Sequence, residues 1–213
     1  MEWFSTVADL FLRLDQHLTD VVGRYGTGTY VLLGLIIFCE TGLVVTPFLP
    51  GDSLLFAAGA IAALGPLDPA VLVALLAGAA VAGDNCNYWI GRWVGPRAFS
   101  GKVRFLNRAY LDRTHAFYEK HGGKTVVLAR FAPILRTFAP FVAGVGAMHY
   151  PRFLRFSITG SLLWVSLFVL GGYFFGNLPV VRENFSLVIL AIIAISLMPA
   201  AVEAFRAWRR AGA

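Results

Sequence analysis

The stretch that decides the fold is residues 40–56, which read ETGLVVTPFLPGDSLLF. It lies inside an apolar tract from Tyr25 to Leu64 whose only charges are Glu40 and Asp52. Helix-breaking residues stand between the two acids, namely Pro47, Pro50 and Gly51. Proline lacks an N–H and clashes with the preceding turn, and lipid tolerates such a break only where protein or a wet cavity satisfies the backbone. The stretch therefore predicts two half-helices that meet at a kink inside a membrane.

Composition indicates an integral membrane protein. Of the 213 residues, 58% are hydrophobic and only 14% are charged, and the mean hydropathy is +0.70, whereas a soluble domain carries about 25% charged residues. The formal net charge of +6 is typical of cytoplasmic loops and contact with anionic lipid. We expect no nucleic-acid partner, because the aromatic residues are not interleaved with a basic patch.

No metal, cofactor or signal peptide is expected. Cys39 and Cys86 stand in apolar surroundings without a CxxC spacing, which favours small buried side chains over a disulfide or a metal pair. The four histidines have no metal-ligand spacing. Residues 1–24 alternate charged and apolar residues and lack the continuous apolar core of a cleavable signal peptide.

Three apolar segments predict membrane-spanning helices. They are Ala70 to Gly91, which is rich in small residues and follows a turn at 65–69, then Phe156 to Val181, and finally Asn184 to Val202. Aromatic residues near these segments are candidate interface anchors: Trp164, Tyr173 and Trp208. The spacing Gly172-x-x-x-Gly176 permits a close helix contact, within the chain or between chains.

Two amphipathic surface helices and a second broken hairpin complete the pattern. Residues Trp3 to Val22 place apolar residues at spacings of three and four, so this helix lies at the interface or docks on the protein itself. Arg92 to Lys124 carries eight Lys or Arg against two acids, which puts it in the cytoplasm, and it contains the second surface helix. Thr125 to Met148 is apolar but interrupted by Arg130, Pro133, Arg136 and Pro140.

The predicted fold class is an all-α integral membrane protein with an inverted repeat, two re-entrant helical hairpins, three membrane-spanning helices and amphipathic surface helices. Repeat 1 covers about 1–92, the cytoplasmic polar segment about 92–124, repeat 2 about 103–181 and the final span about 184–205, within a single domain 1–213. Arginines near the end place the C-terminus in the cytoplasm: Arg206, Arg209 and Arg210. Paired broken segments in two inverted halves indicate a transporter site near the bilayer midplane.

Five charges interrupt the apolar tracts: Glu40, Asp52, Asp84, Arg130 and Arg136. Each costs about 2.5–3.5 kcal/mol at the centre of a membrane helix. The first hairpin supplies acids and the second supplies bases, so we expect them to meet. A set of structural ion pairs is the alternative, but a buried ion pair is weak evidence for stability.

The chemistry of the side chains suggests roles. Guanidinium groups bind phosphate in a bidentate manner, so Arg130 and Arg136, on either side of Pro133, are the predicted phosphate-headgroup site. Glu40 and Asp52 are candidates for proton coupling, because desolvation favours the neutral form of a carboxyl group. Asp52 precedes Ser53 in the manner of an N-cap.

A polar stripe on the second segment is the candidate support for this site. Asp84, Asn87, Tyr88 and Gly91 share one helix face, where they either form interhelical hydrogen bonds or contact substrate. Ser53 and Thr137 lie near the charges in sequence.

Four stretches resemble the bacterial DedA family, and DedA proper within it, in the VTT-domain (SNARE-associated) superfamily of lipid flippases and scramblases. They are Phe38–Phe56, Gly83–Arg92, Tyr110–Lys124 and Ala129–Gly144. The resemblance implies a multi-pass bacterial inner-membrane protein with two re-entrant hairpins that moves undecaprenyl phosphate or phosphatidylethanolamine in a proton-dependent manner. It also implies that the functional acids are Glu40 and Asp52 and the functional arginines Arg130 and Arg136.

The expected function is therefore proton-coupled transport of a phosphate-bearing lipid between leaflets, with no enzymatic step and no cofactor. The expected partners are a membrane phospholipid or a polyprenyl phosphate, and protons. Alternatives are an energy-independent scramblase, a membrane assembly or interaction factor, and a general ion carrier. A lipid phosphatase would need a nucleophile with a base or a metal, and no histidine lies near Ser53 or Thr137 in sequence.

Overall fold

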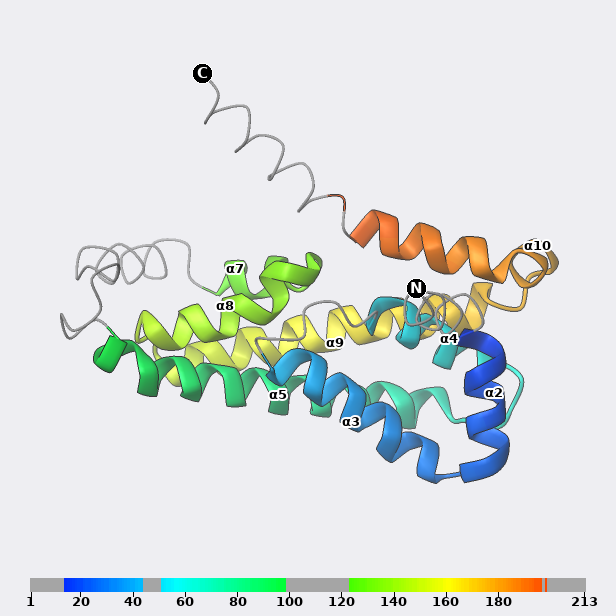
Figure 1. Ribbon diagram of the computed structural model, residues 1–213, viewed down its shortest axis with the longest axis horizontal. Coiled ribbons are helices and arrows are strands. Elements are labelled where there is room, and N and C mark those ends of the chain that lie inside the picture. Colours follow the sequence, from blue (N-terminus) through cyan, green and yellow to red (C-terminus); the bar gives the residue numbers. More distant parts are fainter. Residues whose placement is uncertain (1–13, 44–50, 99–122, 197, 199–213) are drawn as a thin grey trace, which may run out of the picture. The chain divides into compact units, whose positions relative to one another are not determined.

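The computed structural model describes residues 14–43, 51–98, 123–196 and 198, and within them every regular element is a helix (Figure 1). The labelled elements are α2 (Leu14–Tyr25), α3 (Gly28–Gly42), α4 (Gly51–Ala62), α5 (Pro69–Ala98), α7 (Lys124–Ala129), α8 (Pro133–Val145), α9 (Tyr150–Phe175) and α10 (Pro179–Glu183). A further helical segment runs from Phe185 to Ser196. The all-helical class predicted from the sequence is confirmed for these residues.

The chain divides into two compact units, each with its own interior. One consists of the described parts of 1–34, 50–76 and 165–213, and the other of the described parts of 35–49 and 77–164. Helices α3, α5 and α9 contribute residues to both units. The two units are described separately below.

The first broken tract is interrupted where the prolines predict a break. Helix α3 ends at Gly42 and α4 begins at Gly51, while Pro47 and Pro50 lie outside the described residues. Asp52 is the second residue of α4, so its prediction as the N-cap of this helix is wrong. The predicted turn at 65–69 is confirmed, with Gly65 at a φ of 101°, which glycine adopts without steric cost.

The second broken tract is interrupted at one proline and not at the other. Arg130 to Ala132 separate α7 from α8, and Pro133 starts α8, where its missing N–H has no intrahelical partner to lose. Pro140 lies inside α8, so its prediction as a hairpin break is wrong. A proline removes one donor and bends a helix, but packing on both sides can keep the helix continuous.

The two long helices differ from the predicted spans at their ends. Helix α5 contains the predicted Ala70–Gly91 and continues to Ala98, because Arg92 ends the apolar run without ending the helix. The prediction of Phe156–Val181 is wrong at both ends, since α9 covers Tyr150–Phe175. Pro151 is compatible with a first turn, and the chain turns at Gly176 before α10 begins.

The surfaces of two of these helices are consistent with a membrane protein. Helix α5 as far as Gly95 and all of α9 are long and apolar enough to cross a bilayer; the 26 residues of α9 extend about 39 Å at 1.5 Å per residue. Large apolar side chains point outward from α9, with Leu163, Leu167 and Phe174 exposed by 54%, 57% and 64%. Five charged side chains of the described residues are buried inside, namely Glu40, Asp52, Asp84, Arg130 and Arg136, whereas charged residues of soluble proteins are rarely buried.

Other predicted features fall partly outside the described residues. The helix predicted over Trp3–Val22 is observed from Leu14 onward, and residues 1–13 lie outside. The surface helix predicted within Arg92–Lys124 concerns residues 99–122, which also lie outside. Of the final predicted span at 184–205, the helix is described from Phe185 to Ser196. The repeat boundaries stay predictions.

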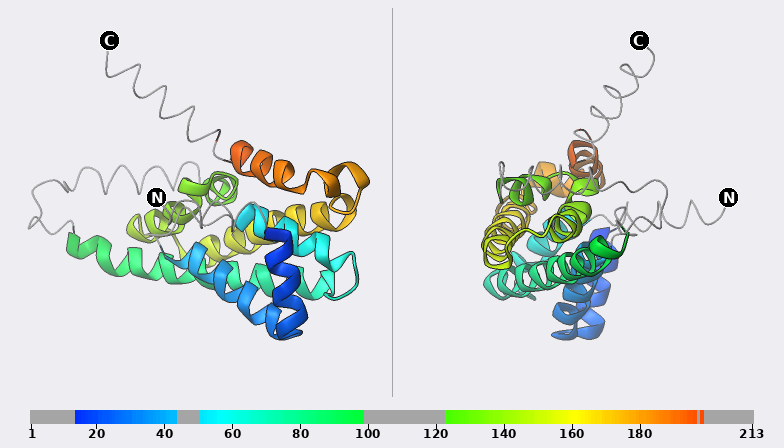
Figure 2. Two further views of the ribbon diagram at one scale, coloured as in Figure 1. Left: turned by 45° about the vertical axis from the view of Figure 1, so that its right-hand side comes forward. Right: turned by 90° about the vertical axis from the view of Figure 1, so that its left-hand side faces the viewer.

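Glycines allow the helix backbones to touch within each unit. In one unit, a Cβ on Gly91 of α5 would lie 2.0 Å from the Phe141 carbonyl oxygen of α8, and a Cβ on Gly144 of α8 would lie 2.0 Å from the Tyr88 carbonyl oxygen of α5. These contacts place α5 and α8 side by side (Figures 1 and 2). Small residues permit such an approach in membrane helices.

The other unit repeats this contact between α4 and α9. A Cβ on Gly59 would lie 2.0 Å from the Val169 carbonyl oxygen, and one on Gly172 would lie 1.9 Å from the Phe56 carbonyl oxygen. A Cβ on Gly176 would also meet α4, 2.4 Å from the Cβ of Ala60. The Gly172-x-x-x-Gly176 motif therefore serves a contact within the chain.

Candidate functional site

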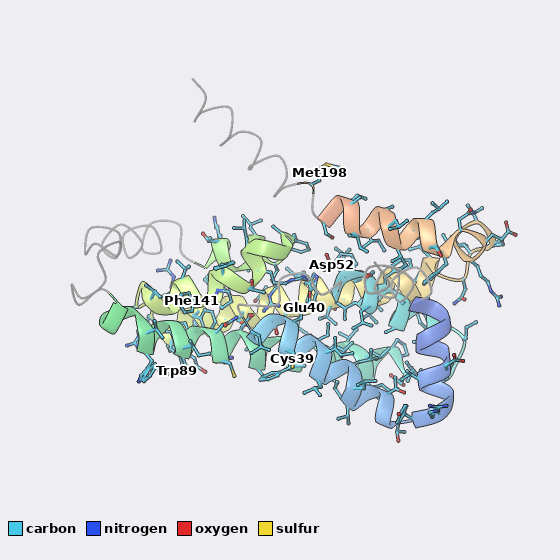
Figure 3. All side chains as sticks on the ribbon, viewed as in Figure 1. Cys39, Glu40, Asp52, Trp89, Phe141 and Met198 are labelled. Carbon is cyan, nitrogen blue, oxygen red and sulfur yellow. The ribbon has the colours of Figure 1, made fainter. Side chains whose placement is uncertain are left out.

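The first element of the site is an ion pair between α3 and α8. Glu40 lies in the last turn of α3 and is 1% exposed, and Arg136 lies in the first turns of α8 and is 3% exposed. Arg136 Nη2 donates to Glu40 Oε1 over 2.7 Å. Figure 3 shows Glu40 beside Cys39, its neighbour on a different face of α3. The expected meeting of a first-hairpin acid with a second-hairpin arginine is found for this pair.

The second element is an ion pair between α5 and the break after α7. Arg130 caps the C-terminus of α7, and its Nη2 donates to Asp84 Oδ2. Ser157 of α9 donates its hydroxyl to the same carboxylate oxygen over 2.6 Å. Asp84 is 1% exposed and Arg130 2%. Three helical segments therefore converge on one carboxylate.

Asn87 forms hydrogen bonds to two of the helices that carry the ion pairs. Its Nδ2 donates to the carbonyl oxygen of Thr41 over 2.6 Å and to that of Thr137 over 3.3 Å, so α5 is joined to α3 and α8. The polar stripe of α5 thus makes the predicted interhelical hydrogen bonds. Gly91 belongs to the same stripe and provides the close contact with α8.

Several polar atoms of the site keep unused hydrogen-bonding capacity. Among the described residues, Arg130 Nε and Nη1, Asp84 Oδ1 and Asn87 Oδ1 are buried without a hydrogen-bond partner. Buried polar atoms of this kind are costly and call for an explanation. Arg130 Nε and Nη1 are donors, and they can donate to an additional anionic oxygen without any existing hydrogen bond being broken.

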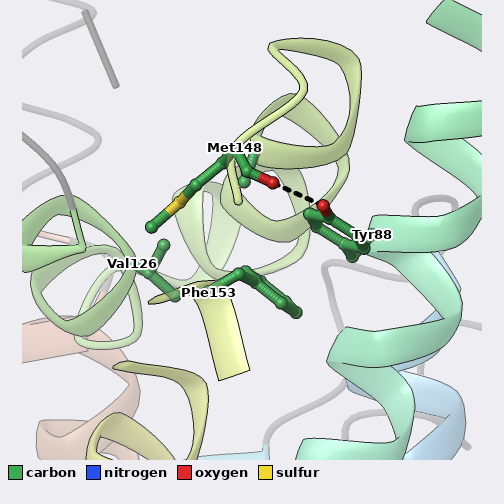
Figure 4. Close-up of a cluster of buried hydrophobic side chains, with 5 residues drawn as sticks. Tyr88, Val126, Met148 and Phe153 are labelled. Carbon is green, nitrogen blue, oxygen red and sulfur yellow. Dashed lines mark hydrogen bonds between the residues drawn. The ribbon is translucent and has the colours of Figure 1, made fainter. Parts of the chain in front are cut away.

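A hydrophobic cluster packs around the C-terminal end of α8 (Figure 4). Tyr88 is fully buried, stacks on Phe153 with ring centroids 4.4 Å apart, and donates its hydroxyl to the Met148 carbonyl oxygen over 2.5 Å. Val126 and Ala143 complete the cluster. This contact fixes the chain just after α8 against α5.

We expect Tyr88→Phe to destabilise the protein by about 1–3 kcal/mol, because it leaves a buried carbonyl oxygen without its donor. Thermal unfolding in detergent measures the change. Tyr30→Phe is the matched control, since Tyr30 accepts a hydrogen bond from the Asp68 amide at an exposed position and its loss should cost less. Equal losses in the two variants would contradict the importance of the Tyr88 contact.

Asp52 and Ser53 belong to the other unit. Asp52 is 6% exposed and its Oδ2 accepts a hydrogen bond from Ser196 Oγ over 2.5 Å, while Ser53 is fully buried in the same turn of α4. Arg136 therefore pairs with Glu40, and Arg130 pairs with Asp84. The pairing of Asp84 with an arginine was not predicted from the sequence.

Sequence reasoning also missed Trp164. Its prediction as an interface anchor is wrong, because Trp164 is fully buried and its ring centroid lies 4.6 Å from Arg136 Cζ and 6.0 Å from Arg130 Cζ. The available signal was the recurrence of Ser157, Gly160, Ser161 and Trp164 at spacings of three and four within a charge-free run. The burial predicted for the cysteines is wrong for Cys86, which is exposed, while Cys39 is half-buried.

The site consists of oppositely charged side chains buried among helices whose outer surfaces are apolar. Buried charges of this kind are typical of functional sites in integral membrane proteins.

The family model of the VTT domain matches residues 49–174. Protein DedA of Escherichia coli K12 is 52% identical over 99% of this chain and 98% of its own length. The inner membrane protein YghB of the same strain is 34% identical over 87% of this chain and 83% of its own. An uncharacterized membrane protein of Mycobacterium tuberculosis H37Rv, Rv0364, is 46% identical over 88% and 83%.

The chain therefore belongs to the DedA family of VTT-domain membrane proteins. No solved structure matches it significantly.

Proposed function

We propose that this protein moves a phosphate-bearing lipid between the leaflets of the bacterial inner membrane and couples this movement to protons. The observation that carries the proposal is the pair of buried arginines, each held by a carboxylate, around one buried indole. A phosphate offers guanidinium groups the same bidentate geometry as a carboxylate. Arg130 and Arg136 are the headgroup-binding residues in this proposal.

Exchange of partners is the proposed binding step. The lipid phosphate replaces Glu40 as the partner of Arg136, and it accepts hydrogen bonds from Nε and Nη1 of Arg130, which have no other hydrogen-bond partner among the described residues. Protonation of Glu40 makes it a neutral ligand and weakens its hold on Arg136. Asp84, which itself accepts a hydrogen bond from Ser157, keeps Arg130 oriented. Asn87, Tyr88 and Thr137 are the proposed supporting residues around this site.

Charge balance gives the reason for coupling to protons. The two arginines and the acids Glu40 and Asp84 are together neutral, and an uncompensated charge in this interior is costly. Each negative charge that a headgroup brings therefore requires one proton. A phosphate monoester carries about 1.5 to 2 negative charges at pH 7, whereas the ethanolamine amine offsets the phosphate of a zwitterionic lipid.

Asp52 remains the second proposed proton site. It is buried beside the hydroxyl of Ser196, and Ser53 lies in the same turn. An ionisable side chain buried within a membrane protein is a candidate for proton transfer by its position alone.

The proposed architecture is an inverted repeat with two re-entrant hairpins, three spans and a cytoplasmic C-terminus. Support comes from the matching contacts of the hairpin helices: α4 packs on α9 through Gly59 and Gly172, and α8 packs on α5 through Gly144 and Gly91. In both cases the second helix of one hairpin meets the long helix of the other half. Labelling of single introduced cysteines from each side of the membrane tests the orientation.

Transport in proteoliposomes tests the function. Labelled undecaprenyl phosphate and labelled phosphatidylethanolamine are supplied separately while proton uptake is recorded, with Arg136→Ala as the inactive variant and Arg182→Ala, at an exposed arginine, as the matched control. We expect about one to two protons for each undecaprenyl phosphate moved. Movement of both lipids without proton uptake would indicate a scramblase, and no movement by folded protein would favour an assembly factor. Release of inorganic phosphate would indicate a phosphatase.

A further inference from the structure

One face of α9 forms a platform for the two arginines, defined here as Ser157, Gly160 and Trp164. These residues are spaced by three and four along the helix, so they share one face. Ser157 donates to the carboxylate that holds Arg130. A Cβ on Gly160 would lie 3.2 Å from both Cδ and Nε of Arg130. The stem of Arg130 therefore crosses α9 at the glycine.

Trp164 is the residue of the platform whose ring lies within cation–π distance of both arginines. Arg136 Cζ lies 4.6 Å from its ring centroid and Arg130 Cζ lies 6.0 Å from it, both within the range in which a cation is attracted to an aromatic ring. The indole is fully buried, so water does not weaken this attraction. Indole is also the aromatic side chain that attracts cations most strongly.

We propose that Trp164 is a positioning residue that keeps Arg130 and Arg136 together when a carboxylate releases its arginine. The two guanidiniums repel each other, and the negative face of the indole offsets part of this repulsion. A proton on Glu40 removes the charge that holds Arg136, but it does not change the indole. The effect on lipid movement rests on the proposed function above, whereas the contact between indole and guanidinium does not.

A space-filling role would give a different pattern of variants. Trp164→Phe retains an aromatic face, whereas Trp164→Leu retains an apolar side chain without one, and both leave a cavity. If Trp164 only fills space, the two variants should lose stability and transport in parallel. If it positions the arginines, Trp164→Leu should raise the lipid concentration for half-maximal transport about tenfold more than Trp164→Phe does. Their unfolding temperatures should be similar.

A spectroscopic measurement separates this proposal from the transport hypothesis. The chain has five tryptophans, and replacement of Trp3, Trp89, Trp93 and Trp208 by phenylalanine leaves Trp164 as the sole emitter. Its emission in detergent should shift in the double variant Glu40→Gln/Arg136→Gln, in which the guanidinium nearest the indole is absent. Removal of the exposed cation in Arg182→Ala should leave the emission unchanged.

The two readouts give distinguishable outcomes. An emission shift with no lipid movement by the parent protein would contradict the proposed function but retain the indole contact. Lipid movement with equal half-maximal concentrations in Trp164→Phe and Trp164→Leu would overturn the positioning role. Emission that does not respond to loss of Arg136 would overturn the contact itself.

Discussion

Arg136→Ala is expected to abolish lipid movement, with a loss of at least about 100-fold, because it removes the charge-assisted bonds that hold a phosphate. Removal of one partner of a buried ion pair also leaves an uncompensated charge, which costs about 3–5 kcal/mol of stability. Glu40 would be that charge, since its Oε1 accepts from Arg136 Nη2 over 2.7 Å. The single variant alone does not separate the two effects.

The double variant Glu40→Gln/Arg136→Gln separates function from folding. Two neutral amides replace the ion pair without leaving a buried charge, and neutral replacements of ion pairs are often tolerated. We expect its unfolding temperature to recover most of what Arg136→Ala loses, while lipid movement stays absent. Transport by the double variant at the parental rate would show that Arg136 does not bind the phosphate.

The second large effect is expected from Gly144→Ala. The new Cβ would lie 2.0 Å from the Tyr88 carbonyl oxygen and 2.8 Å from the Arg92 amide nitrogen, and backbone cannot rotate away as a side chain can. Overpacking typically costs about 1–3 kcal/mol, and contact with backbone places this substitution at the upper end. Helix α8 also carries Arg136, so a displaced α8 should reduce transport as well.

Gly78→Ala on α5 is the matched control for this prediction. No atom lies within 4 Å of a Cβ built on Gly78, and alanine favours a helix over glycine by about 1 kcal/mol. Thermal unfolding in detergent should therefore show a lower midpoint for Gly144→Ala and an unchanged or higher one for Gly78→Ala. Equal midpoints for the two variants would mean that α5 and α8 do not touch at this glycine.

Much of the fold was predictable because its signals are local. A proline or a charge in an apolar run is visible one residue at a time, so the break at Pro133 and the five buried charges could be found directly. The ends of helices were harder to predict from the sequence. In α9, basic residues in the first turns interrupt the apolar pattern, so the start of the helix was placed too late. Pro140 was misleading for a different reason, because the effect of a proline on a helix depends on how that helix packs, and Pro140 lies inside a continuous α8.

By itself, the sequence determined that this is an α-helical membrane protein of the DedA family with acids in one half and arginines in the other. Only the tertiary structure decided that Arg136 pairs with Glu40, 96 residues away, and Arg130 with Asp84, 46 residues away. It alone also decided that Trp164 faces both cations. The physical reason is that the cost of burying a charge depends on the residue and on its apolar neighbours in sequence, which are both visible in the sequence. The partner of that charge depends on which helix faces lie against each other, and the close contacts at the glycines decide this.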